Sequence, residues 1–170
     1  VETPAGAPPM IGPFVYGTDG SGAGNLIVQH GAFRNPLGRT AKANGEMPPP
    51  PKPTLFMDGG EIFAFTLSTI PGAVELLLER AGVDAGQVDL FVFHQANRHM
   101  LDSLRRKTRI APEKFLVCLA DCGNTVSATI PIALSEAHRA GRLRRGTLVA
   151  LVGFGVGYSW AAALCRWGGR

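Results

Sequence analysis

Residues 89–97 read Asp-Leu-Phe-Val-Phe-His-Gln-Ala-Asn, and this stretch decides the fold. Its apolar run, rich in Phe and Val, predicts a buried strand that stops at His94, where polar residues follow. A second apolar run, 115–119, is a candidate strand that ends at a Gly-Asn turn and leads into a predicted helix. Because ligands bind beyond the carboxyl ends of strands in open α/β sheets, we expect His94 and Asn124 to meet there. Together they could donate hydrogen bonds to a carbonyl oxygen that gains negative charge.

Both residues also have an ordinary structural interpretation. A histidine after a strand is commonly a satisfied structural residue, and an asparagine after glycine commonly closes a turn or caps a helix. The two motifs taken alone leave this interpretation open.

The remaining elements alternate along the chain. Strands are predicted at 14–16, 26–28, 148–154 and 158–165, and helices at 61–81, 96–109 and 125–140. Helices that alternate with apolar strands predict an α/β fold. Pro71 is expected to kink or divide the first helix, because proline removes a backbone donor. Residues 1–10 are interpreted as an irregular lead-in or truncated end, 11–170 as one domain, and the Pro-rich stretch 33–53 as a surface excursion.

Composition excludes several classes of protein. Apolar residues make up 45% and charged residues 18% of the 170 residues, which excludes a disordered chain. We find no apolar run of membrane-spanning length and no signal pattern, so no membrane partner is expected. An odd number of cysteines without metal spacing indicates reduced thiols, a cytoplasmic location and no metal site. The net charge of +4 favours an acidic partner but is too small to indicate nucleic acid.

Short motifs along the chain occur in the order and with the spacing of a known family. They are 17–23 (Gly-Thr-Asp-Gly-Ser-Gly-Ala), 57–65 (Met-Asp-Gly-Gly-Glu-Ile-Phe-Ala-Phe), 94–97, 123–125 and 153–160 (Gly-Phe-Gly-Val-Gly-Tyr-Ser-Trp). Between residues 11 and 167 the chain resembles the C-terminal half of the ketoacyl-acyl-carrier-protein synthase III family, within the thiolase superfamily. The resemblance implies one half of a thiolase-like layered α-β-α-β-α fold, a mixed sheet with helices on both faces. The catalytic cysteine of that family is expected in the N-terminal half, which we do not find here.

The resemblance also implies a chemistry. In this family an acyl group from acyl-CoA is loaded onto the cysteine, and the carbanion formed by decarboxylation of malonyl-acyl carrier protein attacks it. His94 and Asn124 would hold the malonyl thioester oxygen as charge collects there. The Val156 N–H would help to hold the acyl oxyanion, at a position where the family usually has glycine, and valine resists a positive φ. No cofactor is implied beyond the coenzyme A and phosphopantetheine thioesters that serve as substrates.

The helix after the His94 motif is where partners are expected. Ala96 and Asn97 match positions that line the pantetheine tunnel. Arg98, His99 and Arg105 would dock the acidic acyl carrier protein, although a solvated helix face is the alternative. The complete enzyme is expected to be a homodimer.

Three alternatives stay open. Related enzymes transfer acyl groups to oxygen, nitrogen or other carbon nucleophiles without decarboxylation. The chain could also be a non-catalytic half that stabilises a partner chain. Cys122, beside the site, could serve as a thiolase-like base or simply as a small turn residue.

Overall fold

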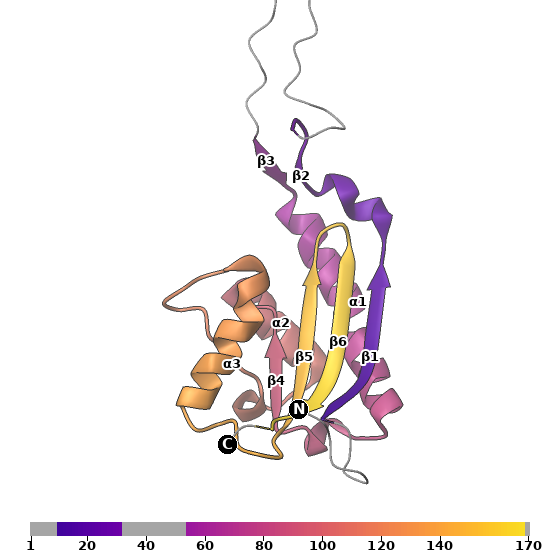
Figure 1. Ribbon diagram of the computed structural model, residues 1–170. Helices are drawn as coiled ribbons and strands as arrows, with labels where there is room; N and C mark the ends of the chain where they lie inside the picture. Colours follow the sequence, from indigo (N-terminus) through magenta and orange to yellow (C-terminus); the bar gives the residue numbers. More distant parts are fainter. Residues whose placement is uncertain (1–9, 32–53, 169–170) are drawn as a thin grey trace, which may run out of the picture.

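The main sheet of the protein has four strands and contains the motif that decides the fold. The computed structural model describes residues 10–31 and 54–168. The strands are β1 (Ile11–Thr18), β4 (Leu90–Phe93), β5 (Leu148–Gly155) and β6 (Ser159–Arg166), in the order β1-β6-β5-β4 (Figure 1). β4 runs parallel to β5, whereas β5 pairs with β6, and β6 with β1, in antiparallel fashion. The sheet is therefore mixed, as predicted.

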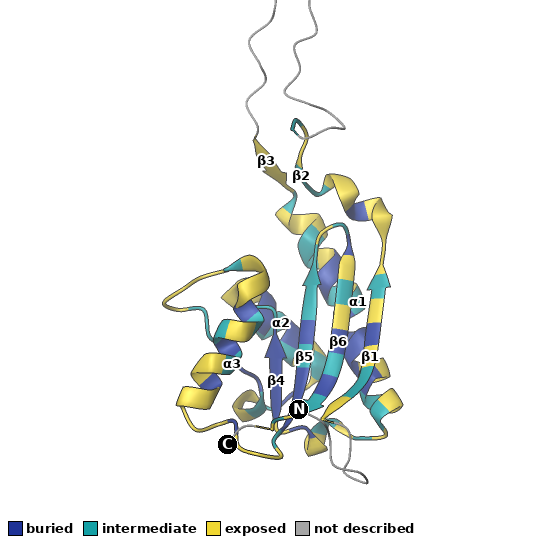
Figure 2. Ribbon diagram, in the orientation of Figure 1, coloured by how far each residue is buried: buried dark blue, intermediate teal, exposed yellow. Residues whose placement is uncertain are grey.

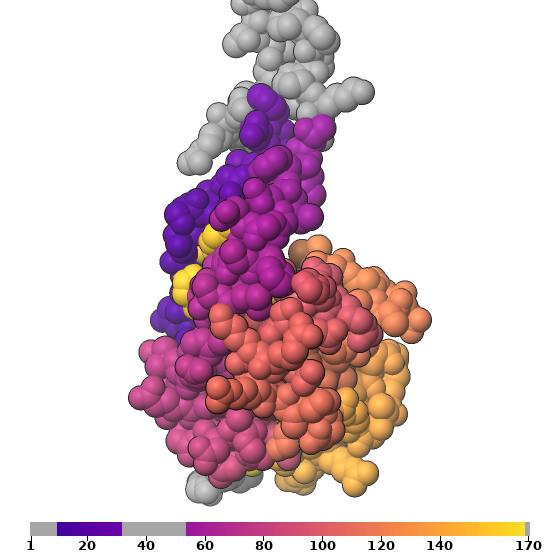
Figure 3. Space-filling model, turned by 180° about the vertical axis from the view of Figure 1, so that it is seen from behind, coloured from indigo at the N-terminus to yellow at the C-terminus, as the bar shows by residue number. Residues whose placement is uncertain are grey.

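Helices cover both faces of this sheet. α1 (Gly59–Ala81) and α2 (Arg98–Thr108) lie on one face, seen from behind in Figure 3, and α3 (Thr129–Arg139) lies on the other. Side chains of β4 alternate between the two layers: Phe91 packs with the α1 and α2 residues, and Val92 packs with the α3 residues. All four residues of β4 are buried, which explains why this strand is an uninterrupted apolar run.

The far part of the sheet is left open on the α3 side. No helix lies over this face of β1 and β6 among the described elements (Figure 2). Phe14 is 53% and Tyr16 81% exposed, although large apolar and aromatic side chains are usually buried. The open face adjoins the site described below, because Tyr16 lines its pocket.

Helix α1 ends at Gly82 as the sequence predicts, but it begins at Gly59, two residues before the predicted start. The Asp58 side chain accepts a hydrogen bond from the Glu61 N–H at 3.0 Å, and Gly82 ends the helix at a φ of 63°. Pro71 does not divide it: the helix is continuous over all 23 residues, with Pro71 buried in its middle. Tertiary packing of the buried face holds the turn that lacks one backbone donor.

The expectation that no apolar run reaches membrane-spanning length is wrong for α1. By length and composition alone, this helix could cross a membrane. Core helices meet the same criterion, and α1 places Ile70, Val74 and Leu77 in the main hydrophobic cluster against the sheet.

Two short strands form a separate pair. β2 (Leu26–Val28) is antiparallel to β3 (Leu55–Met57) and follows a 3₁₀ turn over Gly20–Gly24. Gly22 in this turn lies directly against the Tyr158 ring, where a Cβ atom would collide with it. The motif is thus a tight turn that needs glycine for close packing. The predicted excursion at 33–53 and residues 1–9 lie outside the described part of the chain.

Two predicted elements need correction. The run 115–119 is not a strand, and within it only Phe115 forms a bridge to β4. Further along, the Leu116 carbonyl and the Cys118 N–H form hydrogen bonds with the Gln95 side chain instead of with a neighbouring strand. The helix predicted from 125 begins at Thr129, after a 3₁₀ turn over Val126–Ala128. The Gly155-Val156-Gly157 turn does join β5 to β6 as a hairpin, as predicted.

Candidate active site

The structure brings His94 and Asn124 into the lining of one pocket of about 680 Å³. The pocket lies at the carboxyl end of β4 and beside the β5–β6 turn. His94 follows β4 directly, and its N–H continues the parallel ladder by donating to the Val152 carbonyl at 2.8 Å. Asn124 arrives from the loop that precedes α3. Residues far apart in the sequence thus meet at the end of parallel strands, where α/β sheets bind ligands.

His94 is half-buried and held on two sides. Its Nδ1 lies 2.7 Å from the Thr129 hydroxyl, and its ring contacts Phe154 edge to face at a centroid distance of 5.4 Å. Burial lowers the pKa of His94 from its ordinary value of 6.5, and a hydrogen bond to the Val126 backbone opposes this effect. The Thr129 hydroxyl contacts Nδ1, so Nε2 is the ring nitrogen that a ligand could contact.

The Asn124 side chain is exposed and anchored at one end. Its Oδ1 accepts a hydrogen bond from the Val126 N–H at 2.9 Å, which leaves the Nδ2 group as a free donor among the described residues. The loop makes this turn with positive φ at Gly123 (63°) and at Val126 (56°). A β-branched residue in this region is unusual, and sequence reasoning did not anticipate it.

Val156 lines the same pocket from the β5–β6 turn. Its φ is not positive; the neighbouring Gly157 takes the positive φ of 150° instead. The expected conflict between valine and the turn geometry therefore does not arise. The Val156 carbonyl accepts a hydrogen bond from the Ser159 hydroxyl at 3.2 Å.

Gln95 is a structural residue of the site that sequence reasoning missed. Its side chain is fully buried, and its Nε2 donates to the carbonyls of Phe93 (2.8 Å) and Leu116 (3.3 Å). Its Oε1 accepts from the Cys118 N–H at 2.6 Å. Gln95 therefore joins the end of β4 to the segment that leads to Asn124. The sequence did carry a signal for this role: Gln95 follows a fully apolar strand closely, and an amide buried at such a place must form hydrogen bonds.

The other predicted residues lie outside the pocket lining. Asn97 caps α2 through its Oδ1, which accepts from the Met100 N–H at 2.8 Å, and Ala96 packs against the main hydrophobic cluster. Arg98 and His99 are exposed on the first turn of α2, and Arg105 is half-buried on its last turn. The His99 ring stacks on Phe63 at 5.2 Å.

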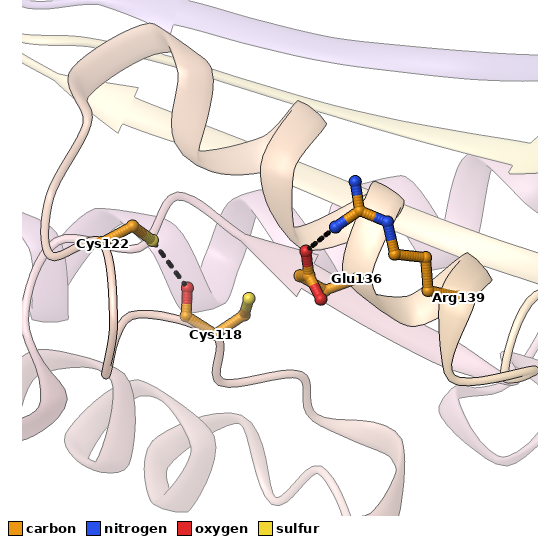
Figure 4. Close-up of polar contacts among 4 residues, drawn as sticks. All are labelled: Cys118, Cys122, Glu136 and Arg139. Carbon is orange, nitrogen blue, oxygen red and sulfur yellow. Dashed lines mark hydrogen bonds and ion pairs between the residues drawn. The ribbon is translucent and has the colours of Figure 1, made fainter.

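Cys122 lies outside the pocket lining. Figure 4 shows its thiol directed at the Cys118 carbonyl, with an Sγ to O distance of 3.7 Å, and Cys122 does not line the pocket. Glu136 and Arg139 form an ion pair on the nearby surface of α3. This placement favours the interpretation of Cys122 as a turn residue. No group of His, Cys, Asp and Glu suited to a metal occurs in the described ranges.

Comparison with known proteins decides the family. The sequence profile described as "3-Oxoacyl-[acyl-carrier-protein (ACP)] synthase III C terminal" matches residues 78–167, more than half of the chain. The chain belongs to the 3-oxoacyl-acyl-carrier-protein synthase III family. The beta-ketoacyl-acyl-carrier-protein synthase III of Gloeobacter violaceus is 38% identical over 155 residues, which are 91% of this chain and 46% of the relative. The chain thus spans about half the length of the curated synthase III relatives that it matches.

Solved structures of synthase III proteins share the fold. One crystal structure of a 3-oxoacyl-(acyl-carrier-protein) synthase III superposes with a TM-score of 0.86 at 46% identity, over 96% of this chain and 50% of that one. The priming beta-ketosynthase from the R1128 polyketide biosynthetic pathway has a TM-score of 0.74 at 30% identity, over 94% and 46% of the two chains. These neighbours show the thiolase-like fold, of which this chain is one half.

Proposed function

We propose that the chain is the C-terminal half of a condensing enzyme. The enzyme joins an acyl group from acyl-CoA to malonyl-acyl carrier protein by decarboxylative Claisen condensation, in fatty acid or polyketide biosynthesis. The observation that carries this proposal is the convergence of His94, Asn124 and the Val156 turn on one pocket. Membership of the synthase III family supports the reaction class. The catalytic cysteine is expected in the N-terminal half, so the 170 residues alone should form no acyl-enzyme.

In this proposal the described donors act on the decarboxylation step. Loss of carbon dioxide leaves an enolate, whose negative charge collects on the malonyl thioester oxygen. Asn124 through Nδ2 and His94 through Nε2 donate hydrogen bonds to that oxygen. Preorganised donors stabilise the transition state because they need no reorientation as the charge develops, and removal of one typically costs about 2.7–4 kcal/mol of barrier. The anchoring of Asn124 by the Val126 N–H supplies this preorganisation.

The acyl-loading step uses a different oxyanion hole. There the negative charge develops on the acyl carbonyl oxygen beside the nucleophile. The Val156 N–H, together with the nucleophile's own N–H, would hold that oxygen. Separate holes for the two steps let each be preorganised for its own transition state.

The same half would also bind the partners of the enzyme. The pantetheine arm would pass Ala96 and Asn97, and the acidic carrier protein would dock on Arg98, His99 and Arg105. Positively charged side chains on one helix, Arg98 and Arg105 here, attract such a partner and speed its association. We propose no metal and no cofactor beyond the thioester substrates, no nucleic acid or membrane partner, a homodimer for the complete enzyme and a cytoplasmic location.

The experiment that tests this proposal supplies the N-terminal half of the enzyme. This chain is co-expressed with the N-terminal half of the Gloeobacter violaceus relative, and release of labelled carbon dioxide from malonyl-acyl carrier protein is measured with acetyl-CoA present. We expect release with both halves and none with either alone. His94→Ala should abolish it, whereas His138→Ala, an exposed histidine on α3, should not. Acyl loading from acetyl-CoA without carbon dioxide release would favour a non-decarboxylating acyltransferase.

A further inference from the structure

Tyr158 joins the β5–β6 turn to the 3₁₀ turn that follows β1. It lies two residues after Val156 and is only 7% exposed. Its backbone N–H donates to the Asp19 carbonyl, and its own carbonyl accepts from the Asp19 N–H at 2.8 Å. These hydrogen bonds extend the β1–β6 ladder beyond its last strand pair. The C-terminal side of the turn that carries Val156 is therefore attached to the segment 19–25.

The side chain of Tyr158 is held by groups from this segment and from α1. Its hydroxyl oxygen accepts a hydrogen bond from the Asn25 Nδ2 group at 2.5 Å. Its ring lies parallel to the Phe65 ring at a centroid distance of 4.0 Å. A Cβ atom at Gly22 would lie 2.3 Å from a carbon of the Tyr158 ring, whereas ordinary contact begins at 3.4 Å. A side chain at this position would therefore have to displace the ring by about 1 Å.

The groups that hold Tyr158 differ from those that hold the two candidate donors. His94 contacts the Thr129 hydroxyl, and Asn124 is anchored within the loop that precedes α3. Val156 lines the same pocket, but it is carried by the turn that Tyr158 attaches. A displacement of Tyr158 should thus move the Val156 N–H and leave His94 and Asn124 in place.

We propose that Tyr158 is a positioning residue for acyl loading: packed against Gly22 and bonded to Asn25, it fixes the place of the Val156 N–H in the pocket. This inference rests on the proposed function, in which that N–H holds the acyl oxygen as negative charge develops on it. A donor stabilises such a charge best when it is already in place, and a displacement of about 1 Å can slow a reaction by about 10²-fold.

The first test measures the position of Val156 in the full chain without substrate. Gly22→Ala places a methyl group against the Tyr158 ring, and the φ of Gly22 is not positive, so the backbone accepts alanine. Gly24→Ala is the matched control in the same turn, because a Cβ atom there meets no described atom within 4 Å. The chain is labelled with ¹⁵N-valine, and loss of a signal in Val156→Leu identifies the Val156 amide. Gly22→Ala should shift this signal and Gly24→Ala should not. An unshifted signal in Gly22→Ala would overturn the proposal.

The second test follows the two chemical steps in this chain combined with the N-terminal half of the Gloeobacter violaceus relative. Loading is measured as transfer of label from acetyl-CoA to protein. Carbon dioxide release is measured on the isolated acyl-enzyme, per acyl group present. Gly22→Ala should slow loading by about 10- to 100-fold and leave carbon dioxide release near the wild-type rate, whereas Gly24→Ala should change neither. Equal losses in the two steps, or in the two variants, would indicate a purely structural contact and overturn the proposal.

Two further variants decide the matter if Gly22→Ala does not fold. Tyr158→Phe keeps the ring and removes the hydroxyl, and Asn25→Ala removes the donor to that hydroxyl. Each should shift the Val156 signal and slow loading by roughly two- to tenfold, the worth of one hydrogen bond. The double variant should lose no more than either single variant, because all three lack the same bond. An unchanged signal and loading rate in both single variants would overturn the proposal.

Failure of the proposed function would give a different result. The wild-type pair of halves would then show neither loading nor carbon dioxide release, while Gly22→Ala or Tyr158→Phe would still shift the Val156 signal in the chain alone. That result would refute the condensing activity and support the positioning of Val156 by Tyr158.

Discussion

The side-chain oxygen of Gln95 accepts a hydrogen bond from the backbone N–H of Cys118 at 2.6 Å. This contact fixes the distance between the end of β4, which carries His94, and the segment that leads to Asn124. The same amide also serves the carbonyls of Phe93 and Leu116. One buried side chain therefore sets the spacing of the two candidate donors.

Replacement of this amide should destabilise the protein. Gln95→Leu fills a similar volume but leaves three buried backbone groups without their partner, at about 1–3 kcal/mol for each such group. Partial relaxation should bring the total to roughly 3 kcal/mol, measured by urea denaturation. Gln87→Leu, an exposed glutamine, is the control and should lose much less. A Gln95→Leu protein as stable as wild type would contradict this role.

Substitution of Val126, in contrast, should stabilise the protein. Its φ of 56° is unfavourable for a β-branched residue, and the residue is 73% exposed. Left-handed backbone costs an ordinary residue about 1–2 kcal/mol, and asparagine tolerates it better. Val126→Asn should therefore raise the unfolding free energy by about 1 kcal/mol. Val156→Asn, at an exposed valine whose φ is not positive, should bring no such gain. Equal effects of the two substitutions would argue against backbone strain at Val126.

The three thiols should differ in reactivity. Cys122 is exposed, whereas burial raises the pKa values of the Cys118 and Cys165 thiols. Because the thiolate is the reactive form, alkylation at neutral pH should modify Cys122 first. Timed treatment with iodoacetamide, followed by peptide mass spectrometry, measures this order. Cys118 reacting as fast as Cys122 would show that the loop opens in solution.

The stability of the chain should depend on pH through His94. Its pKa is lowered in the folded state, so the unfolded chain binds the proton at a higher pH than the folded chain does. Stability from this group is complete above pH 6.5, the ordinary value, and is lost as the pH falls through the folded pKa. Urea denaturation at several pH values should show a smaller loss in His94→Gln than in wild type. His138→Gln should keep the wild-type dependence, and an identical loss in His94→Gln would contradict the assignment.

The sequence predicted those parts of the fold that local patterns determine. The apolar run of β4, the glycine that ends α1 and the glycine turn of the hairpin each carry their own signal, and the structure has all three. His94 and Asn124 were found because both follow apolar runs at turn residues. Gln95, Thr129 and the φ of Val126 were not, because each depends on contacts between segments that are distant in the sequence. The same holds for 115–119, where a side chain replaces the strand partner that the apolar pattern predicted.

In the proposed function, His94 and Asn124 act on the malonyl oxygen and not on acyl loading. The most direct measurement assays the two steps separately in the enzyme with its other half restored: transfer of label from acetyl-CoA to protein, and carbon dioxide release from malonyl-acyl carrier protein. His94→Ala and Asn124→Ala should each slow carbon dioxide release by about 10²–10³-fold and leave loading nearly intact. The double variant should lose less than the sum of the two, because both donors serve one oxygen. Loss of loading with carbon dioxide release preserved would contradict these roles of His94 and Asn124.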